Sequence, residues 1–244
     1  MSLDHLELLA ADIADFVDAL AAGPADAPIA GCPGWTLLDL GVHLGSVHRW
    51  ARGAIITGAV PTADPDDPPP TKLAEVATWV RAGGDRLLAT LHGIDPSQPT
   101  WHPFPVEPKV AGLWRRRQAQ EASVHRWDAQ RAIGMEAAIE TAFAADGIDE
   151  YWTVMLPRLI MRESRAVPSS VVAVCTTDTG QRWVVDGRGG SVALAAEGVQ
   201  PAAEIAGDAQ SLLLRLWGRP IRQGSLATRG DEAVAGDWLA LGGA

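Results

Sequence analysis

The chain of 244 residues contains little cysteine and few basic side chains. Its two cysteines, Cys32 and Cys175, are too few and too far apart for a disulfide framework or a multi-thiolate zinc site. Only Lys72 and Lys109 are lysines, and the 20 basic residues are outnumbered by 30 acidic ones. The formal charge of −10 leaves no basic field for phosphates or anionic lipid, so we expect no nucleic-acid partner.

Long hydrophobic runs are also missing. No uninterrupted apolar stretch reaches the roughly 18 residues that a membrane-spanning helix needs. The first residues, MSLDHLELLAADIADF, carry acidic side chains where a secretory signal peptide has a basic segment. With 47% hydrophobic residues the chain can still bury a large core. We therefore expect a cytoplasmic protein that does not enter a membrane and is a monomer or a small homo-oligomer.

Apolar residues at three-and-four spacing predict four amphipathic helices in the first part of the chain. The helices are expected at about 3–21, 36–57, 72–91 and 109–134. Thr36 followed by Asp39 is the pattern of a capping box at the start of the second helix. Proline-rich loops join the helices, and nothing strand-like lies among them. Residues 1–140 are therefore predicted to form an all-α four-helix bundle.

The sequence pattern changes after about residue 140. A helix at about 142–163 is followed by three short β-branched runs, SSVVAVCTT, QRWVVDG and GSVALAAEG, which turn-forming residues separate. The following PAAEIAG and SLATRGD are further strand candidates, and DAQSLLLRLWGR and EAVAGDWLAL are predicted helices. Residues 141–244 are therefore predicted to form a small α+β domain with an antiparallel sheet and helices on one face.

One pair of side chains in the fourth predicted helix is suited to bind a metal. Glu121 lies four residues before His125, which places the two side chains on the same side of a helix. Carboxylate oxygen and imidazole nitrogen are both good zinc ligands, and a catalytic zinc site typically uses three protein ligands. His43, on the inward face of the second helix, is the best candidate for the third ligand. His48 lies five residues further on and cannot share its direction.

Simpler interpretations of these residues remain open. A pair with E-x-x-x-H spacing is more often a solvated face or an intrahelical hydrogen bond. Asp39 and Asp128 could each orient a ligand histidine, or could be an ordinary cap or surface charge. Residues 115–117, three consecutive arginines, are expected to be a solvated helix face. Cys32 precedes a helix, as some reactive thiols do, but with no resolving cysteine nearby a buried structural thiol is favoured.

Four stretches resemble the mycothiol-dependent maleylpyruvate isomerase family, whose N-terminal half is a DinB-like metal-binding bundle. They are CPGWTLLDLGVHLGSVHRW (32–50), RRRQAQEASVHRWDAQRAIG (115–134), AADGIDEYW (144–152) and LLLRLWGRP (212–220). The resemblance spans nearly the whole chain and includes the second domain. It implies a divalent metal, usually zinc, held by His43, Glu121 and His125. It also implies that the thiolate of mycothiol occupies the open coordination position.

The same resemblance implies an enzyme, either a cis-trans isomerase of the maleylpyruvate type or an S-transferase that acts on an electrophilic small molecule. The second domain of the family supplies an arginine that orients an anionic substrate. Arg219 is the candidate here, with Arg222 as the rival, and it is expected to reach toward the open side of the metal from a cleft between the domains. The alternative is that Arg219 only caps carbonyls at the end of its own helix.

Two other functions stay open at this point. The chain could be a non-catalytic metal-binding or regulatory protein, in which a fourth protein ligand such as His48 or Asp128 closes the metal site. It could also be a metal-dependent hydrolase, which needs a general base beyond the ligands.

Overall fold

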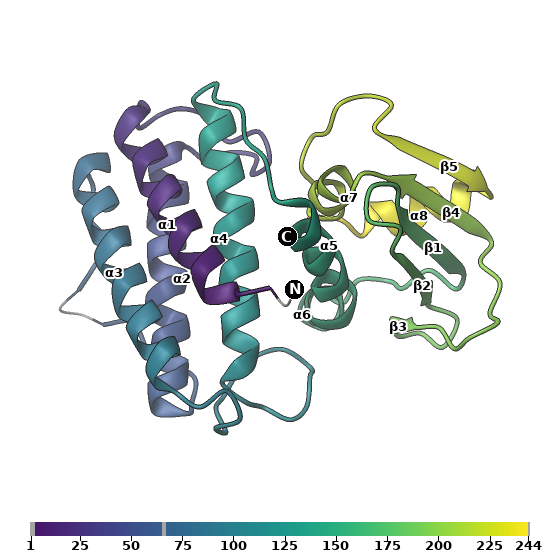
Figure 1. Ribbon diagram of the computed structural model, residues 1–244, viewed down its shortest axis with the longest axis horizontal. Coiled ribbons are helices and arrows are strands. Elements are labelled where there is room, and N and C mark those ends of the chain that lie inside the picture. The colour runs from purple at the N-terminus through teal and green to yellow at the C-terminus, as the bar shows by residue number, and fades with distance from the viewer. Residues whose placement is uncertain (1–2, 65–66, 244) are drawn as a thin grey trace. The chain divides into compact units, whose positions relative to one another are not determined.

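The computed structural model describes residues 3–64 and 67–243. The chain divides into two compact units, one formed by Met1–His102 with Val106–Ala138 and the other by Pro103–Pro105 with Ile139–Ala244. All four long helices belong to the first unit, and the sheet belongs to the second (Figure 1). The predicted fold class, a four-helix bundle followed by a small α+β part, is confirmed.

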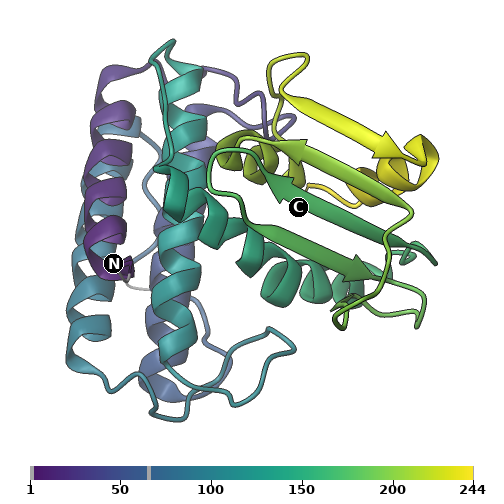
Figure 2. The ribbon, with the colours of Figure 1, turned by 45° about the vertical axis from the view of Figure 1, so that its right-hand side comes forward.

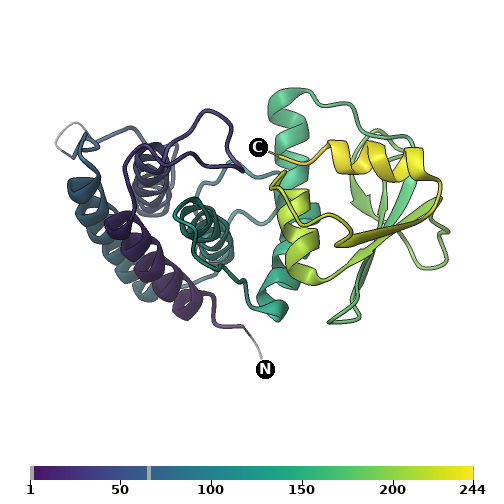
Figure 3. The same cartoon turned by 90° about the horizontal axis from the view of Figure 1, so that it is seen from above.

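The first unit is a bundle of four helices in a closed ring (Figures 1 and 3). Helices α1 and α2 each contact both α3 and α4. The helices are α1 (His5–Ala22), α2 (Leu37–Thr57), α3 (Leu73–Gly93) and α4 (Gly112–Ala132). Because α2 and α4 are direct neighbours, side chains from their facing sides can meet.

The ends of α1 and α2 are fixed by local hydrogen bonds. Asp4 caps α1 by accepting from the backbone N–H of Leu6 at 3.0 Å. At α2 the predicted capping box is present, because the Asp39 carboxylate accepts from the Thr36 backbone N–H and the Thr36 hydroxyl accepts from the Asp39 N–H. The core behind this cap contains fully buried Leu37, Leu40 and Leu44. The start of α2, and with it the direction of each α2 side chain, is thus set by residues that the sequence identifies.

Tryptophans fill much of the space beside α2 and α4. Trp50 makes edge-to-face contacts with Trp101 and Trp114, with ring centroids 5.5 Å apart in both pairs. Trp114 is completely buried, and its indole N–H donates to the Trp101 carbonyl oxygen at 3.3 Å. Trp50 on α2 and Trp114 on α4 therefore pack directly against each other.

The second unit is a mixed five-stranded sheet with helices behind one face (Figure 2). Its order is β3-β2-β1-β4-β5. The strands are β1 (Val171–Thr176), β2 (Arg182–Asp186), β3 (Ala193–Leu194), β4 (Ala203–Gly207) and β5 (Leu226–Gly230). The helices are α5 (Thr141–Glu150), α6 (Leu156–Glu163), α7 (Ala209–Leu216) and α8 (Glu232–Ala240). Helix α8 contacts β1 and β4, and α7 packs against α5.

Two details of this unit differ from the sequence expectation. The sheet is mostly antiparallel, but β1 and β4 pair in parallel, because the chain returns from β3 to the free edge of β1. The helix predicted at 142–163 contains a π-helical turn over Tyr151–Met155 between α5 and α6. Periodicity does not reveal such a turn, since it inserts a single residue into an otherwise regular apolar pattern.

None of the helices in the described part of the chain is both long enough and apolar enough to cross a membrane.

Candidate metal centre

The three predicted ligands meet between α2 and α4. One carboxylate oxygen of Glu121, Oε1, lies 3.2 Å from His43 Nε2 and 3.4 Å from His125 Nε2. One ligand atom from each of the three residues lies within 4.8 Å of the other two. The rings of His43 and His125 stand edge to face with centroids 5.0 Å apart. The helical spacing of Glu121 and His125, and the inward direction of His43, therefore do bring the three donors together.

This donor set fits a divalent metal. Two imidazole nitrogens and one carboxylate oxygen are the ligands of one class of catalytic zinc site, in which a fourth position stays open. The side chain of His43 is 32% exposed, while those of Glu121 and His125 are mostly buried, so the donors are accessible from the His43 side. Trp35 packs against the His43 ring with centroids 4.9 Å apart. Among the described residues no group of four ligand atoms converges here, and His48 does not join the three.

Glu121 is held as a carboxylate by its neighbours. Burial would raise its pKa, but hydrogen bonds from His125 and His43, together with the nearby charge of Arg117, hold the pKa of Glu121 well below its usual range. Arg117 Nη2 donates to Glu121 Oε2 at 3.1 Å, which leaves Oε1 facing the two histidines. The sequence expectation of a solvated face was wrong for Arg117, whose side chain is only 3% exposed.

Arg115, two residues before Arg117, is also engaged with the protein. Its Nη2 donates to the carbonyl oxygens of Leu91 and Ile94 at 2.8 and 3.0 Å. An (i, i+4) spacing between Arg117 and Glu121 is visible in the sequence and could have identified the contact. Burial of Arg117 could not be predicted in the same way, since it depends on how neighbouring segments pack around α4.

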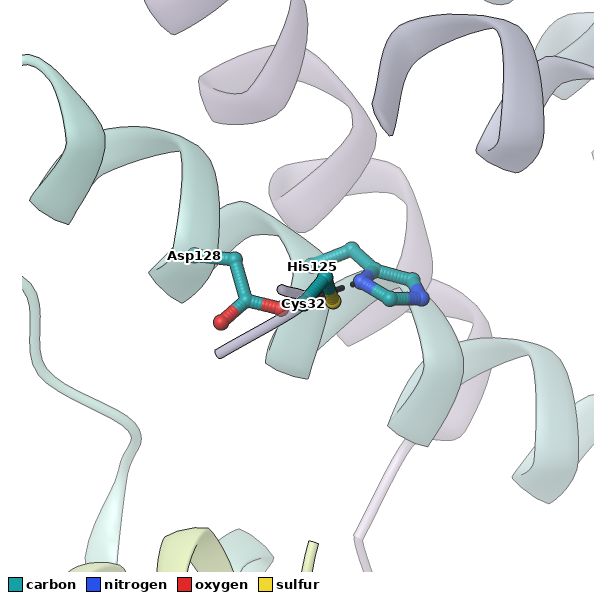
Figure 4. Close-up of side chains that lie close together, drawn as sticks. All are labelled: Cys32, His125 and Asp128. Atoms are coloured by element: carbon teal, nitrogen blue, oxygen red, sulfur yellow. Dashed lines mark hydrogen bonds and ion pairs between the residues drawn. The ribbon is translucent and has the colours of Figure 1, made fainter. Parts of the chain in front are cut away.

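Asp128 orients the second histidine. Its Oδ2 lies 3.1 Å from His125 Nδ1, and its side chain is 1% exposed (Figure 4). A carboxylate can only accept, so His125 donates its Nδ1 proton to Asp128, and this bond turns Nε2 toward Glu121 and His43. Burial would lower the pKa of His125, but the hydrogen bonds to Asp128 and Glu121 outweigh burial and raise it. Of the two interpretations weighed for Asp128, the contact matches the orienting one.

Asp39 has the other role weighed for it. Its carboxylate is engaged with Thr36 in the cap of α2, where Oδ2 also accepts from the Thr36 hydroxyl at 2.6 Å. The hydrogen bonds from Thr36 lower the pKa of Asp39. Asp39 therefore sets the start of α2, from which His43 follows one helical turn later.

Cys32 lies beside the same histidine, which the sequence did not indicate. Its sulfur, His125 and Asp128 form a second group whose ligand atoms lie within 4.8 Å of one another (Figure 4). Cys32 is not part of a disulfide, is partly buried, and packs against the hydrophobic core of the bundle. Backbone bonds from Cys32 N–H to Ile29 O and from Trp35 N–H to Cys32 O fix the turn that carries it.

His48 is completely buried near this centre and is kept neutral there. Neither ring nitrogen has a hydrogen-bond partner among the described residues. Burial lowers the pKa of His48 to about 3, opposed by the charge of Glu121 and aided by Arg49, His125 and His43. A neutral, unpartnered imidazole in a helix-bundle core costs stability that a hydrocarbon side chain of similar size would not.

We expect His48→Leu to change how stability depends on pH. The pKa of a histidine in the unfolded chain is about 6.5, so as pH falls below this value the unfolded state takes up a proton that folded His48 does not. The free energy of unfolding is therefore highest above about pH 6.5, and the part of it that depends on His48 titration is lost as the pH falls toward 3. As the pH is lowered between these values, the unfolding free energy of the wild type should decrease faster than that of the variant. The difference in slope should be roughly 1.4 kcal/mol per pH unit. Urea unfolding of both metal-free proteins at several pH values measures the difference, and parallel curves would contradict the prediction.

Arg219 lies at the end of α7, at the position expected from the sequence. It is 5% exposed, and its Nη1 donates to the Trp217 carbonyl oxygen at 2.8 Å. Gly218 adopts a left-handed conformation (φ 73°) and turns the chain there. Arg222 follows in the loop before β5. The contact with Trp217 is the helix-end cap that was weighed against a role in substrate binding.

Comparisons with known proteins identify similar sequences and structures. Residues 6–130 match the family model of the mycothiol maleylpyruvate isomerase N-terminal domain. A crystal structure of a histidine-to-alanine mutant of mycothiol-dependent maleylpyruvate isomerase matches with a TM-score of 0.60 and 12% identity, covering 93% of this chain and 92% of that one. A second structure of mycothiol-dependent maleylpyruvate isomerase matches with a TM-score of 0.54 and 14% identity over the same shares. At these identities the two structures establish the fold. No curated protein matches the sequence.

Proposed function

This chain belongs to the mycothiol maleylpyruvate isomerase family, and we propose that it is a metal-dependent enzyme that uses mycothiol as a thiol cosubstrate. The observation that carries the proposal is the convergence of His43, Glu121 and His125 on one point between α2 and α4. A family match alone would leave open whether this chain has kept a working centre. The converged donors and the absence of a fourth ligand within the described residues favour a centre that can accept a small molecule.

His43, Glu121 and His125 would hold the ion, for which zinc is the expected metal and another divalent metal is possible in its place. When bound, zinc lowers the pKa of a thiol and stabilises the thiolate as a nucleophile. The chain's own residues prepare the site for this. Asp128 holds His125 with Nε2 available, and Arg117 offsets part of the charge of Glu121.

Two reactions are compatible with this centre. In an isomerase the thiol adds to a conjugated double bond, the former double bond rotates, and the thiol leaves again, so that the thiol is regenerated. In an S-transferase the thiol stays attached to the electrophile and is consumed. Neither reaction needs a cysteine of the chain as the nucleophile, because the small thiol supplies the sulfur. The alternative of a non-catalytic metal-binding protein has the same ligands but no turnover.

The test is a thiol-dependence assay on protein of measured metal content. We expect maleylpyruvate or an alkylating electrophile to be converted only when both zinc and mycothiol are present. Chelated protein, and zinc protein with cysteine in place of mycothiol, are the controls. Measuring free thiol at the end separates the isomerase, which returns it, from the transferase, which does not. Conversion without any thiol would favour the hydrolase, and bound zinc with no conversion would favour the binding protein.

Arg219 is proposed to hold a carboxylate of the substrate, since an arginine fork matches a carboxylate in two places. In that role Arg219→Ala should lower kcat/KM for a carboxylate-bearing electrophile by roughly tenfold or more, with metal content unchanged. An uncharged electrophile should be converted at the wild-type rate, which separates loss of substrate binding from loss of structure. Arg222→Ala is the matched comparison. Equal loss on charged and uncharged electrophiles would assign Arg219 to the end of α7 alone.

A further inference from the structure

A cavity separate from the three ligands lies along the outer side of α2. Its volume is about 910 Å³, and its walls come from α2, from α3 and from described residues of the proline-rich loop before α3. Cavities of this size accommodate small organic ligands. The side chains of Trp50, Trp79 and Ile56 give it apolar walls, and three arginines and two aspartates supply charge.

One wall of the cavity is fixed by Asp67. The Asp67 carboxylate accepts from Arg49 Nε at 2.7 Å, Arg86 Nη2 at 2.7 Å and the Trp79 indole N–H at 2.6 Å. The Arg49 guanidinium also lies over the Trp79 ring, with Cζ 3.6 Å from its centroid. Together these bonds, chiefly the one from Arg49, lower the pKa of Asp67. Asp67 therefore bonds the loop to both helices, and its carboxylate pairs with both Arg49 and Arg86.

Two glycines make room for this arrangement. A Cβ atom on Gly45 would lie 2.3 Å from the Trp79 ring, and one on Gly83 would lie 2.2 Å from Arg49 Nη1. Neither helix could approach the cluster this closely with a larger residue at these positions. In this cavity wall the glycine backbones pack closely against the Trp79 ring and the Arg49 guanidinium. Such a fixed wall favours binding of a rigid ligand.

Arg52 is the remaining cation of the cavity. It lines the cavity, forms no ion pair with any described residue, and its buried Nε has no hydrogen-bond partner there. Among the described residues of the lining, three arginines face two aspartates, which is an excess of positive charge within a protein of net charge −10. A buried guanidinium N–H without a partner is costly unless a ligand or water accepts from it.

We propose that this cavity is a binding site for an organic anion with a flat apolar body. Arg52 receives the carboxylate or an equivalent anionic group, and the body lies against the ring of Trp50 and the side chain of Ile56. Ser46 and Trp50, which also line the cavity, follow His43 by one and two turns on α2. The site is independent of the three metal ligands, so it stands whether or not the proposed thiol chemistry is correct.

The experiment compares a charged and a neutral ligand of the same shape, 2-naphthoate and 2-naphthamide, by titration calorimetry on metal-free protein. Wild-type protein should bind naphthoate roughly tenfold more tightly than naphthamide, as expected for one charge-assisted hydrogen-bonded contact. Arg52→Gln should remove this preference, leaving the two affinities about equal. Ser46→Trp, a change at an exposed position on the rim, should weaken both ligands by filling the cavity.

The matched control is Arg81→Gln. Arg81 lies on α3 and lines a different cavity of about 600 Å³ between α1 and α3, so its loss removes a charge without touching Arg52. The naphthoate preference should survive in this variant. The proposal is overturned if neither compound binds wild-type protein, if the preference persists in Arg52→Gln, or if Arg81→Gln abolishes it as well. Circular dichroism of each variant establishes that the bundle is folded.

Discussion

Replacing His43 by alanine should abolish tight metal binding while the bundle stays folded. His43 supplies one of three donors and is the most exposed of them, so its removal leaves two ligands and opens no large cavity in the core. Loss of a residue that only orients a ligand typically lowers metal affinity 10–100-fold, and loss of a ligand itself should exceed about 100-fold. Thiol-dependent turnover should fall in parallel with metal content.

The measurement is zinc content after dialysis against a competing chelator, together with thermal unfolding of the metal-free proteins. His92→Ala is the matched control, because His92 is an exposed histidine near the end of α3 and should retain wild-type zinc content. Unchanged zinc in His43→Ala would place the metal elsewhere. Unfolding of His43→Ala in the metal-free state would mean that the residue holds the bundle together, in conflict with its exposure.

Replacing Arg126 by leucine should be the most destabilising single change that the bundle reveals. Arg126 on α4 donates Nε to Asp12 Oδ1 on α1 at 2.7 Å, Nη1 to Gln130 Oε1 at 2.8 Å and Nη2 to the Ala138 carbonyl at 2.8 Å. Asp12 and Arg126 are both buried. Removing one partner of a buried ion pair leaves an uncompensated charge, which typically costs about 3–5 kcal/mol.

Acid should relieve part of this loss. Burial already raises the pKa of Asp12, although Arg126 opposes the shift. Without Arg126 the pKa of Asp12 should rise further. The folded state then binds a proton that the unfolded state releases above its own pKa of about 3.8, so stability falls as pH rises from that value. Urea unfolding should therefore show a larger deficit for Arg126→Leu near pH 7 than near pH 4.

The double variant Asp12→Leu/Arg126→Leu provides the control, since it removes both charges and leaves hydrocarbon in their place. It should recover most of the stability lost in Arg126→Leu, because well-packed apolar residues often replace a buried pair at little cost. A double variant as unstable as the single one would attribute the loss to packing or to the bonds with Gln130 and Ala138.

The parts of this protein that the sequence predicts depend on neighbours along the chain. The capping pattern of Thr36 and Asp39 locates the start of α2, and the four-residue spacing of Glu121 and His125 places both on one side of α4. The prediction that His43 lies beside them depends on its position on the inward face of α2, and the family resemblance supports it. Each of these depends on helix geometry, which is the same in every protein.

The parts that the sequence did not predict depend on contacts between distant segments. Arg117 is charged and belongs to a run of arginines, and only the packing around α4 makes it a buried partner of Glu121. Asp67 lies in a loop whose composition indicates no regular structure, yet its carboxylate accepts hydrogen bonds from side chains of α2 and α3. The parallel pairing of β1 with β4 depends on which edge of β1 the chain returns to, and strand composition carries no information on that choice.

The distribution of the candidate metal ligands over the chain bears on how such a protein can diverge. All three donors, together with Arg117 and Asp128, belong to two neighbouring helices of one compact unit. The other unit, which contains the whole sheet, holds none of these five side chains. Roughly half of the chain can therefore change in sequence while all of these side chains stay in place.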